Sequence, residues 1–213
     1  MEDARNNQAA HSASGDLSER FDARWPLGVQ LPKLLLASSS PRRSEILRIV
    51  GWDFEVGAVE VDESLRPGED ARAYVERLAA EKATAAADVH AHRPVLAADT
   101  TVVVDEQILA KPEDADDAKR MLRLLQGRWH EVLTGIAVVL NSETRVAHEQ
   151  TEVMFAPMSE VEISWYVSTG EPMDKAGAYA IQGQGARFIK AINGDYFNVM
   201  GLPVRLLYEL IHP

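Results

Sequence analysis

The chain has 213 residues, of which 46% are hydrophobic and 26% charged, a composition that excludes a fully disordered chain, a collagen and a coiled coil. Its 22 Lys and Arg residues stand against 33 Asp and Glu residues, and the formal net charge of -11 argues against a nucleic-acid partner. There is no cysteine, which excludes disulfides, thiolate metal sites and a cysteine nucleophile.

Residues 1–30 differ in composition from the rest of the chain. They contain polar runs such as Asn6-Asn7-Gln8 without sustained hydrophobic periodicity, and no apolar core of a secretory signal follows the first residue. We therefore predict a disordered N-terminal extension over residues 1–30 and a folded domain over residues 31–213. The length of this domain allows one compact unit, or two small lobes around one cleft.

The first half of the predicted domain alternates strands and helices. The apolar run Lys33–Ser38 predicts a buried strand, and Ser40 followed by Pro41 predicts the start of a helix. A second strand is expected at Phe54–Val59. The segment Asp70–Val89 is rich in Ala, Glu and Arg, which predicts a long helix.

The centre of the chain combines a valine-rich strand with a hairpin. Pro94–Val104 and Ile108–Ala110 are expected to be strands, and Asp114–Leu125 has the apolar spacing of an amphipathic helix. Trp129–Leu140 and Thr144–Phe155 predict two antiparallel strands.

The last third of the chain is expected to contain helices and tight turns. A capping box predicts a helix over Ser159–Val167, and Leu202–Ile211 predicts a closing helix. We expect short strands and tight turns over the glycine-dense stretch Gly177–Gly201. Because strands and helices alternate early and hairpins come later, the sequence predicts a mixed α/β fold.

The first candidate site lies between a predicted strand and a helix, in the run Ser38–Arg43. A helix N-terminus offers unpaired N–H groups, Ser38 and Ser40 add hydroxyls, and Arg42 and Arg43 add guanidinium groups suited to phosphate oxygens. The alternative is a capped helix with solvated arginines.

The second candidate is Asp99, which lies within an apolar strand. An ionised carboxylate there is costly unless a cation or donors meet it, and a divalent metal ion is a suitable partner. A strand bulge whose N–H groups bind the carboxylate is the alternative.

Other charged residues give weaker signals. Lys82 continues the stripe of Val75 and Leu78, so it either reaches back to water or points into a cleft. Lys111 and Glu63 lie in predicted loops, where charged residues are usually solvated.

Histidines are expected to be structural or exposed. His130 precedes a strand and fits a core or edge position. His90 and His92 follow a helix end and are expected at the surface, because no third ligand lies beside them.

A last cluster, Asp174–Gly183, brings charge, small residues and an amide together. Gly177 and Gly183 permit close approach of the backbone to a ligand, and the Gln182 amide can complement the imide edge of uracil or thymine. The alternative is a glycine-rich turn whose glutamine binds only backbone.

Seven short motifs follow one another along the chain: S-x-S-P-R-R at Ser38–Arg43, Glu81-Lys82, Ala98-Asp99-Thr100, Lys111-Pro112, His130–Gly135, Asp174–Gly183 and Gly201-Leu202-Pro203. Their ordered set resembles that of Maf-type nucleotide pyrophosphatases, and the resemblance covers the chain from about Leu31 to its end. It implies an elongated mixed α/β sheet with flanking helices and two lobes around a central cleft, similar to inosine triphosphate pyrophosphatases.

The resemblance also implies a reaction, in which a nucleoside triphosphate is hydrolysed to a monophosphate and pyrophosphate with Mg²⁺ or Mn²⁺. The catalytic positions would be Asp99, Glu63, Lys82 and Lys111, with Glu63 and Asp99 holding the metal. The substrate-binding positions would be Ser38, Ser40, Arg42, Arg43, Thr100, Asp174, Lys175 and Gln182. In this hypothesis Asp99 also orients or deprotonates the water that attacks the α-phosphorus.

Within the family, the dTTP/UTP type is the most similar, with specificity positions at Arg42, Thr100 and Gln182. The Gln182 amide can donate to O4 or O2 of the base and accept from N3–H. No residue is identified that reads the 2′-position of the sugar. We therefore expect both dTTP and UTP as substrates.

Two other functions stay open at this point. The chain could be a nucleotide-binding regulator of septum formation, although the presence of Glu63 and Asp99 favours an enzyme, or a pyrophosphatase for modified nucleotides. The family resemblance also suggests a homodimer. We expect a cytoplasmic protein that binds no nucleic acid, and we expect no membrane partner because the apolar stretches are far too short to span a bilayer.

Overall fold

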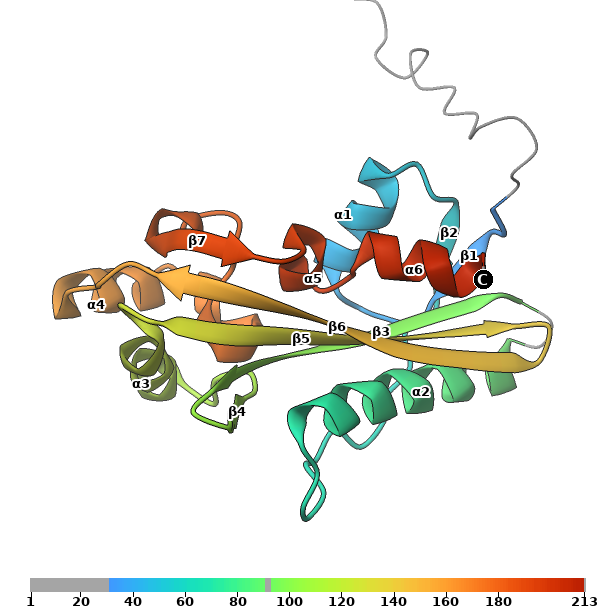
Figure 1. The fold of residues 1–213 in the computed structure, drawn as a ribbon, viewed down its shortest axis with the longest axis horizontal. Helices are drawn as coiled ribbons and strands as arrows, with labels where there is room; N and C mark the ends of the chain where they lie inside the picture. Colours follow the sequence, from blue (N-terminus) through green and yellow to red (C-terminus); the bar gives the residue numbers. More distant parts are fainter. Residues whose placement is uncertain (1–30, 91–92, 213) are drawn as a thin grey trace, which may run out of the picture. The chain divides into compact units, whose positions relative to one another are not determined.

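The computed structural model describes residues 31–90 and 93–212 (Figure 1). The prediction for residues 1–30 and the one for His92 lie outside the described residues. In chain order, the elements are β1 (Leu34–Leu36), α1 (Pro41–Ile49), β2 (Phe54–Val56), α2 (Ala71–Val89), β3 (Val95–Val104), β4 (Gln107–Leu109), α3 (Ala115–Leu125), β5 (Trp129–Leu140), β6 (Glu143–Phe155), α4 (Glu160–Ser168), the short 3-10 helices η2 (Glu171–Asp174), η3 (Ala176–Ala178) and η4 (Gly185–Phe188), β7 (Ile189–Asn193), α5 (Tyr196–Met200) and α6 (Val204–Ile211).

The seven strands form one mixed sheet, which confirms the predicted fold class. Its order is β2-β1-β3-β5-β6-β7, and β4 pairs with β3 beside this path. Strand β1 runs parallel to β2 and β3, whereas β3, β5, β6 and β7 pair antiparallel. Helix α2 lies along one face of the sheet, and α5 and α6 lie on the other (Figure 1).

Helix α2 packs closely on the sheet because small residues face each other. Ala79, Ala83 and Ala86 of the helix form a buried cluster with the inward-facing residues Val95 and Ala97 of β3. On β5, a Cβ added to Gly135 would lie 2.3 Å from the carbonyl oxygen of Val75. Glycine is therefore required at position 135, where the helix backbone approaches the strand.

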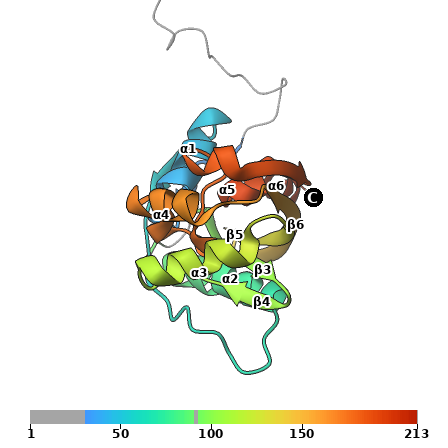
Figure 2. The same cartoon turned by 90° about the vertical axis from the view of Figure 1, so that its left-hand side faces the viewer.

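A second hydrophobic cluster lies at the other end of β3. Figure 2 views the molecule from this end, where α3 and α4 lie. The cluster includes Val102 and Val104 of β3, together with Leu122, Phe155 and Tyr166. Between the two clusters, β3 carries three polar residues, Asp99, Thr100 and Thr101. The two clusters lie on either side of the candidate site within one compact unit, residues 32–213.

Most predicted elements are confirmed to within two residues, including the capping box of Ser159 and Glu162. Two predictions are wrong. Strand β2 ends at Val56 instead of Val59, because its pairing with β1 ends once Gly57 N has donated to Leu36 O at 3.0 Å.

The second wrong prediction concerns Gly177–Gly201, which contains helix α5 as well as turns and a strand. The Asp195 carboxylate begins this helix by accepting from Phe197 N at 2.7 Å. No helix of the described residues is both long enough and apolar enough to cross a lipid bilayer.

Candidate active site

The site lies at a gap along one edge of β3. Strand β1 pairs with β3 only as far as Leu96, and β4 pairs with it from Val102 onward. Between these pairings, the described part of the sheet gives β3 a strand neighbour only on the β5 side. Chain crossovers at the carboxyl end of a strand commonly leave such a crevice for a ligand.

A pocket of about 440 Å³ opens at this gap. The structure brings every predicted site residue to its lining: Ser38, Ser40, Arg42, Arg43, Glu63, Lys82, Asp99, Thr100, Lys111, Asp174, Lys175 and Gln182. They come from the loop after β1, helix α1, the loop before α2, helix α2, strand β3, the loop after β4, and the segment around η2 and η3 with the turn that follows it. The lining also includes Tyr74, which the sequence did not single out.

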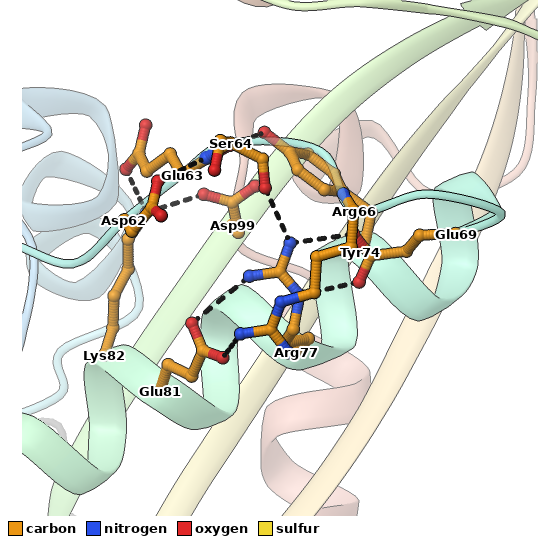
Figure 3. Close-up of polar contacts among 10 residues, drawn as sticks. All are labelled: Asp62, Glu63, Ser64, Arg66, Glu69, Tyr74, Arg77, Glu81, Lys82 and Asp99. Carbon is orange, nitrogen blue, oxygen red and sulfur yellow. Dashed lines mark hydrogen bonds and ion pairs between the residues drawn. The ribbon is translucent and has the colours of Figure 1, made fainter.

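The centre of the pocket is a lysine between two carboxylates (Figure 3). Asp99 lies on the same face of β3 as Val95 and Ala97, so its side chain faces α2, from which Lys82 approaches. Lys82 Nζ lies 2.7 Å from Asp99 Oδ1 and 2.5 Å from Glu63 Oε1. The sequence analysis expected a metal ion as the partner of Asp99; in the structure this partner is the ammonium group of Lys82.

The environment keeps Glu63 ionised. Partial burial opposes its ionisation, but the hydrogen bond and charge of Lys82, together with the charges of Lys111 and Arg43, outweigh burial and lower the pKa of Glu63. Lys111 is exposed and forms no hydrogen bond or salt bridge within the described ranges. It therefore acts on Glu63 through its positive charge alone. Two carboxylates and one ammonium leave the centre one negative charge in excess.

Glu63 and Asp99 are the groups that could hold a divalent cation. The part of the chain that the structure describes contains no cluster of three or more His, Asp or Glu residues able to hold one. Mg²⁺ is often bound by one or two carboxylates, with substrate phosphates and water completing its shell. The two oxygens that share Lys82 fit this incomplete set, so the residues suit a cation that arrives with a phosphate-bearing ligand.

The first turn of α1 and the loop before it form the cationic wall of the pocket. Arg43 is anchored there at three points: its Nε donates to Gly201 O at 2.8 Å, its Nη1 to Ser38 Oγ at 2.9 Å and its Nη2 to Thr100 Oγ1 at 3.2 Å. Burial lowers the pKa of Arg43, but a guanidinium stays protonated at neutral pH. Ser40 is the N-cap of α1 without capping through its hydroxyl, which leaves that hydroxyl to the pocket.

A bridge of charges crosses from α1 to the segment around η2. Arg42 Nη1 lies 3.3 Å from Asp174 Oδ2, and Lys175 contacts the same carboxylate while donating to Glu171 O at 2.7 Å. Burial opposes ionisation of Asp174, but Lys175 and Arg42 outweigh it and lower the pKa of Asp174. Arg42 is therefore paired in the structure, rather than solvated as in the alternative reading of its motif.

Gln182 is carried by a turn that one carboxylate holds together. Glu171 accepts from Gln184 N and Gly185 N, each at 2.9 Å, and from the Tyr166 hydroxyl at 2.8 Å. Gly183 has a φ of +62°, and a Cβ there would lie 2.5 Å from Glu171 Oε2. Sequence reasoning missed Glu171 and Tyr166, because nothing in their spacing ties them to the turn.

The residues around His130 are structural. Its Nε2 lies 2.8 Å from the Tyr179 hydroxyl, and burial lowers the pKa of His130 to about 4, so the imidazole is neutral at pH 7. In the same motif, Thr134 Oγ1 lies 3.0 Å from Thr100 Oγ1 and donates to Asn198 O at 3.0 Å. The motif lies on β5, and Thr134 supports the paired strand β3 at Thr100. His130 is buried in the core, as expected.

Comparison with known proteins gives consistent matches. A family model described as "Maf-like protein" matches residues 33–213. A dTTP/UTP pyrophosphatase of Symbiobacterium thermophilum is 52% identical over 181 residues, covering 85% of this chain and 93% of the relative. The dTTP/UTP pyrophosphatase of Chromobacterium violaceum is 51% identical over 177 residues, covering 81% and 89%. Among solved structures, the Staphylococcus aureus Ham1 protein matches with a TM-score of 0.45 and 18% identity, over 74% of this chain and 79% of that one.

Proposed function

Because the chain belongs to the Maf family, we propose that it hydrolyses dTTP and UTP to the nucleoside monophosphate and pyrophosphate. The observation that carries this proposal is the Glu63–Lys82–Asp99 cluster inside a pocket whose wall carries two arginines. A triphosphate needs local positive charge in a chain of net charge -11, and this wall supplies it. We place the activity in the cytoplasmic nucleotide pool.

The phosphate chain is held by cationic and hydroxyl groups from both sides of the pocket. Ser38, Ser40 and the N-terminus of α1 donate hydrogen bonds to its oxygens, and Arg42 and Arg43 supply charge. Lys82 and Lys111 act from the opposite side. Placement and charge stabilisation account for most of the rate in phosphoryl chemistry, so a fixed arginine such as Arg43 is of more use than a mobile one.

Asp99 prepares the water that attacks. A carboxylate that accepts a proton from water makes it a better nucleophile, and Asp99 is held at one position by Lys82. The water oxygen bonds to the α-phosphorus, the bond from that phosphorus to the bridging oxygen breaks, and pyrophosphate leaves. Glu63 and Asp99, with phosphate oxygens, would hold Mg²⁺ or Mn²⁺. Such a cation lowers the pKa of water and neutralises charge on the phosphates.

The base is read by Gln182. Its side chain is partly exposed at the pocket and forms no hydrogen bond to the described residues, so its amide is available to a ligand. One donor and one acceptor match O4 and N3–H of uracil and thymine. Thr100 acts less directly, because its hydroxyl is bonded to Arg43 and Thr134.

A panel of nucleoside triphosphates, scored for pyrophosphate release with and without Mg²⁺ or Mn²⁺, tests the proposal. We expect dTTP and UTP to be hydrolysed faster than purine triphosphates, with activity lost on chelation. A clear preference for a purine triphosphate would overturn the substrate assignment, and release of orthophosphate would overturn the bond assignment. The homodimer stays a prediction, which light scattering of the purified protein tests directly.

A further inference from the structure

The loop that carries Glu63 has no regular structure of its own. Between the end of β2 at Val56 and the N-cap of α2 at Asp70, the chain forms neither helix nor strand. The Glu63 side chain is 49% exposed, so surrounding protein does not confine it. Val59 and Val61 pack against the hydrophobic core at the start of the loop. From Glu63 onward, a set of polar contacts with one side of α2 fixes the loop (Figure 3).

Arg77 of α2 makes more of these contacts than any other residue of the helix, and Arg66 of the loop adds a pair with Glu81 at 2.8 Å. The Nε of Arg77 lies 2.6 Å from Glu69 Oε1 and its Nη2 lies 2.8 Å from Glu69 Oε2, a two-pronged ion pair. The same Nη2 donates to Ser64 O at 3.1 Å, and Nη1 lies 3.2 Å from Glu81 Oε2. All three guanidinium nitrogens of Arg77 are therefore engaged, two of them with the loop.

This pair differs from an ordinary surface salt bridge. The side chains of Arg77 and Glu69 are 12% and 9% exposed, and paired prongs fix orientation as well as distance. The hydrogen bonds from Arg77 lower the pKa of Glu69 to about 2. Isolated ion pairs at the protein surface contribute little to stability. Here, in addition, Arg77 donates to the main-chain carbonyl of Ser64, the residue next to Glu63.

Tyr74 connects the same arginine to Glu63. The Arg77 guanidinium lies 5.6 Å from the centre of the Tyr74 ring, and the Tyr74 hydroxyl donates to Glu63 O at 2.9 Å. Two successive carbonyls of the loop, those of Glu63 and Ser64, are thus bound by residues one turn apart on α2. Lys82, further along this helix, then meets the Glu63 carboxylate.

From these contacts we propose that Arg77 is a positioning residue for Glu63. Arg77 does not line the pocket, so it acts through the loop. By binding Glu69 and Ser64, it holds the loop on α2 in the one arrangement where Glu63 faces Lys82 and Asp99. This inference rests on the proposed function for the role of Glu63 in turnover.

The test compares R77M and E69Q with R205M, an arginine variant whose ion pair with Glu209 is exposed. Kinetics with dTTP give kcat and KM separately, and hydrogen exchange reports amide protection in residues 60–69. We expect kcat to fall about tenfold or more in R77M and E69Q, with KM changed less than about threefold, because misplacing a reacting group slows turnover more than binding. Exchange in residues 60–69 is expected to rise while β5 and β6 keep their protection.

Conservative replacement and a double-mutant cycle separate positioning from general stability. R77K keeps a charge near Glu69 and is expected to recover part of kcat. In an E63Q background, R77M is expected to cost little further activity, because the group that it positions has already been removed. An equal fold-loss in both backgrounds would show that Arg77 does not act through Glu63, and R205M should match the wild type throughout.

The outcomes also distinguish this inference from the proposed function. If the wild type releases no pyrophosphate from any triphosphate, the proposed function fails, and the exchange of residues 60–69 alone decides whether Arg77 holds the loop. Unchanged exchange in R77M and E69Q overturns the inference whatever the activity. If R77M does not fold, E69Q carries the test, and if E63Q has no measurable activity, exchange replaces the cycle.

Discussion

Lys82 Nζ lies 2.7 Å from Asp99 Oδ1, and this contact joins the long helix α2 to the middle of strand β3. Both residues are at least nine-tenths buried. The same ammonium reaches Glu63, so a single lysine bridges two of the carboxylates that line the pocket. Its replacement should therefore affect stability as well as chemistry.

The variant K82M is expected to lower the free energy of unfolding by about 3 kcal/mol, because Asp99 then lacks its buried counter-charge. Chemical denaturation of wild type and variant measures the difference. The matched control is K119M, since Lys119 pairs with an exposed Asp116 and should cost less than about 1 kcal/mol. Equal small effects for both lysines would mean that the contact with Asp99 contributes little.

The turn that carries Gln182 gives a second prediction. In E171Q, an amide NH₂ replaces one carboxylate oxygen and faces a backbone N–H group, so either Gln184 N or Gly185 N loses its acceptor. We expect the preference for dTTP over purine triphosphates to fall about tenfold, with kcat for dTTP less affected. A substrate panel compares E171Q with E209Q, whose carboxylate lies far along the chain in α6. Unchanged selectivity in E171Q would show that the turn held by Glu171 does not determine which base is bound.

The buried imidazole of His130 predicts a specific pH dependence of stability. Burial lowers its pKa from 6.5 to about 4, so between these pH values the unfolded chain binds a proton that the folded chain excludes. Stability should therefore fall as the pH drops from about 7 to about 4, and His130 alone contributes roughly 3 kcal/mol to that loss.

Denaturation curves of wild type and H130Q across this range isolate the contribution of the imidazole. The variant should lose less stability than the wild type as the pH falls, because glutamine takes up no proton. The Tyr179 hydroxyl can still find a partner in the glutamine amide. If the free energy of unfolding of the two proteins fell equally with pH, the His130 imidazole would not be the source of the pH dependence.

The positions of the site residues along the chain could be predicted, but their pairings could not. The apolar run of β3 placed Asp99 in a buried strand, and that alone indicated a partner that is a cation or a set of hydrogen-bond donors. Whether that partner would be a metal or a lysine depends on α2 packing across β3 and β5. Close approach of the helix, through alanines and Gly135, brings Lys82 within reach of Asp99.

Elements with weak local signals were harder to predict. Helix α5 is five residues long and lies in a glycine-dense stretch, so its hydrophobic periodicity is too short to identify. The contacts of Arg42 with Asp174 and of Glu171 with the Gln182 turn join residues of separate elements. No spacing rule within one helix or strand predicts such contacts.

Pyrophosphate release from dTTP by the variant D99N decides whether Asp99 activates the attacking water in the pocket. The fold should survive, because Lys82 keeps Glu63 as an ionised partner and asparagine fills nearly the same volume. We expect D99N to keep its thermal midpoint within a few degrees of the wild type and to lose at least about 99% of the wild-type rate. A folded D99N protein that releases pyrophosphate at close to the wild-type rate would contradict this role of Asp99.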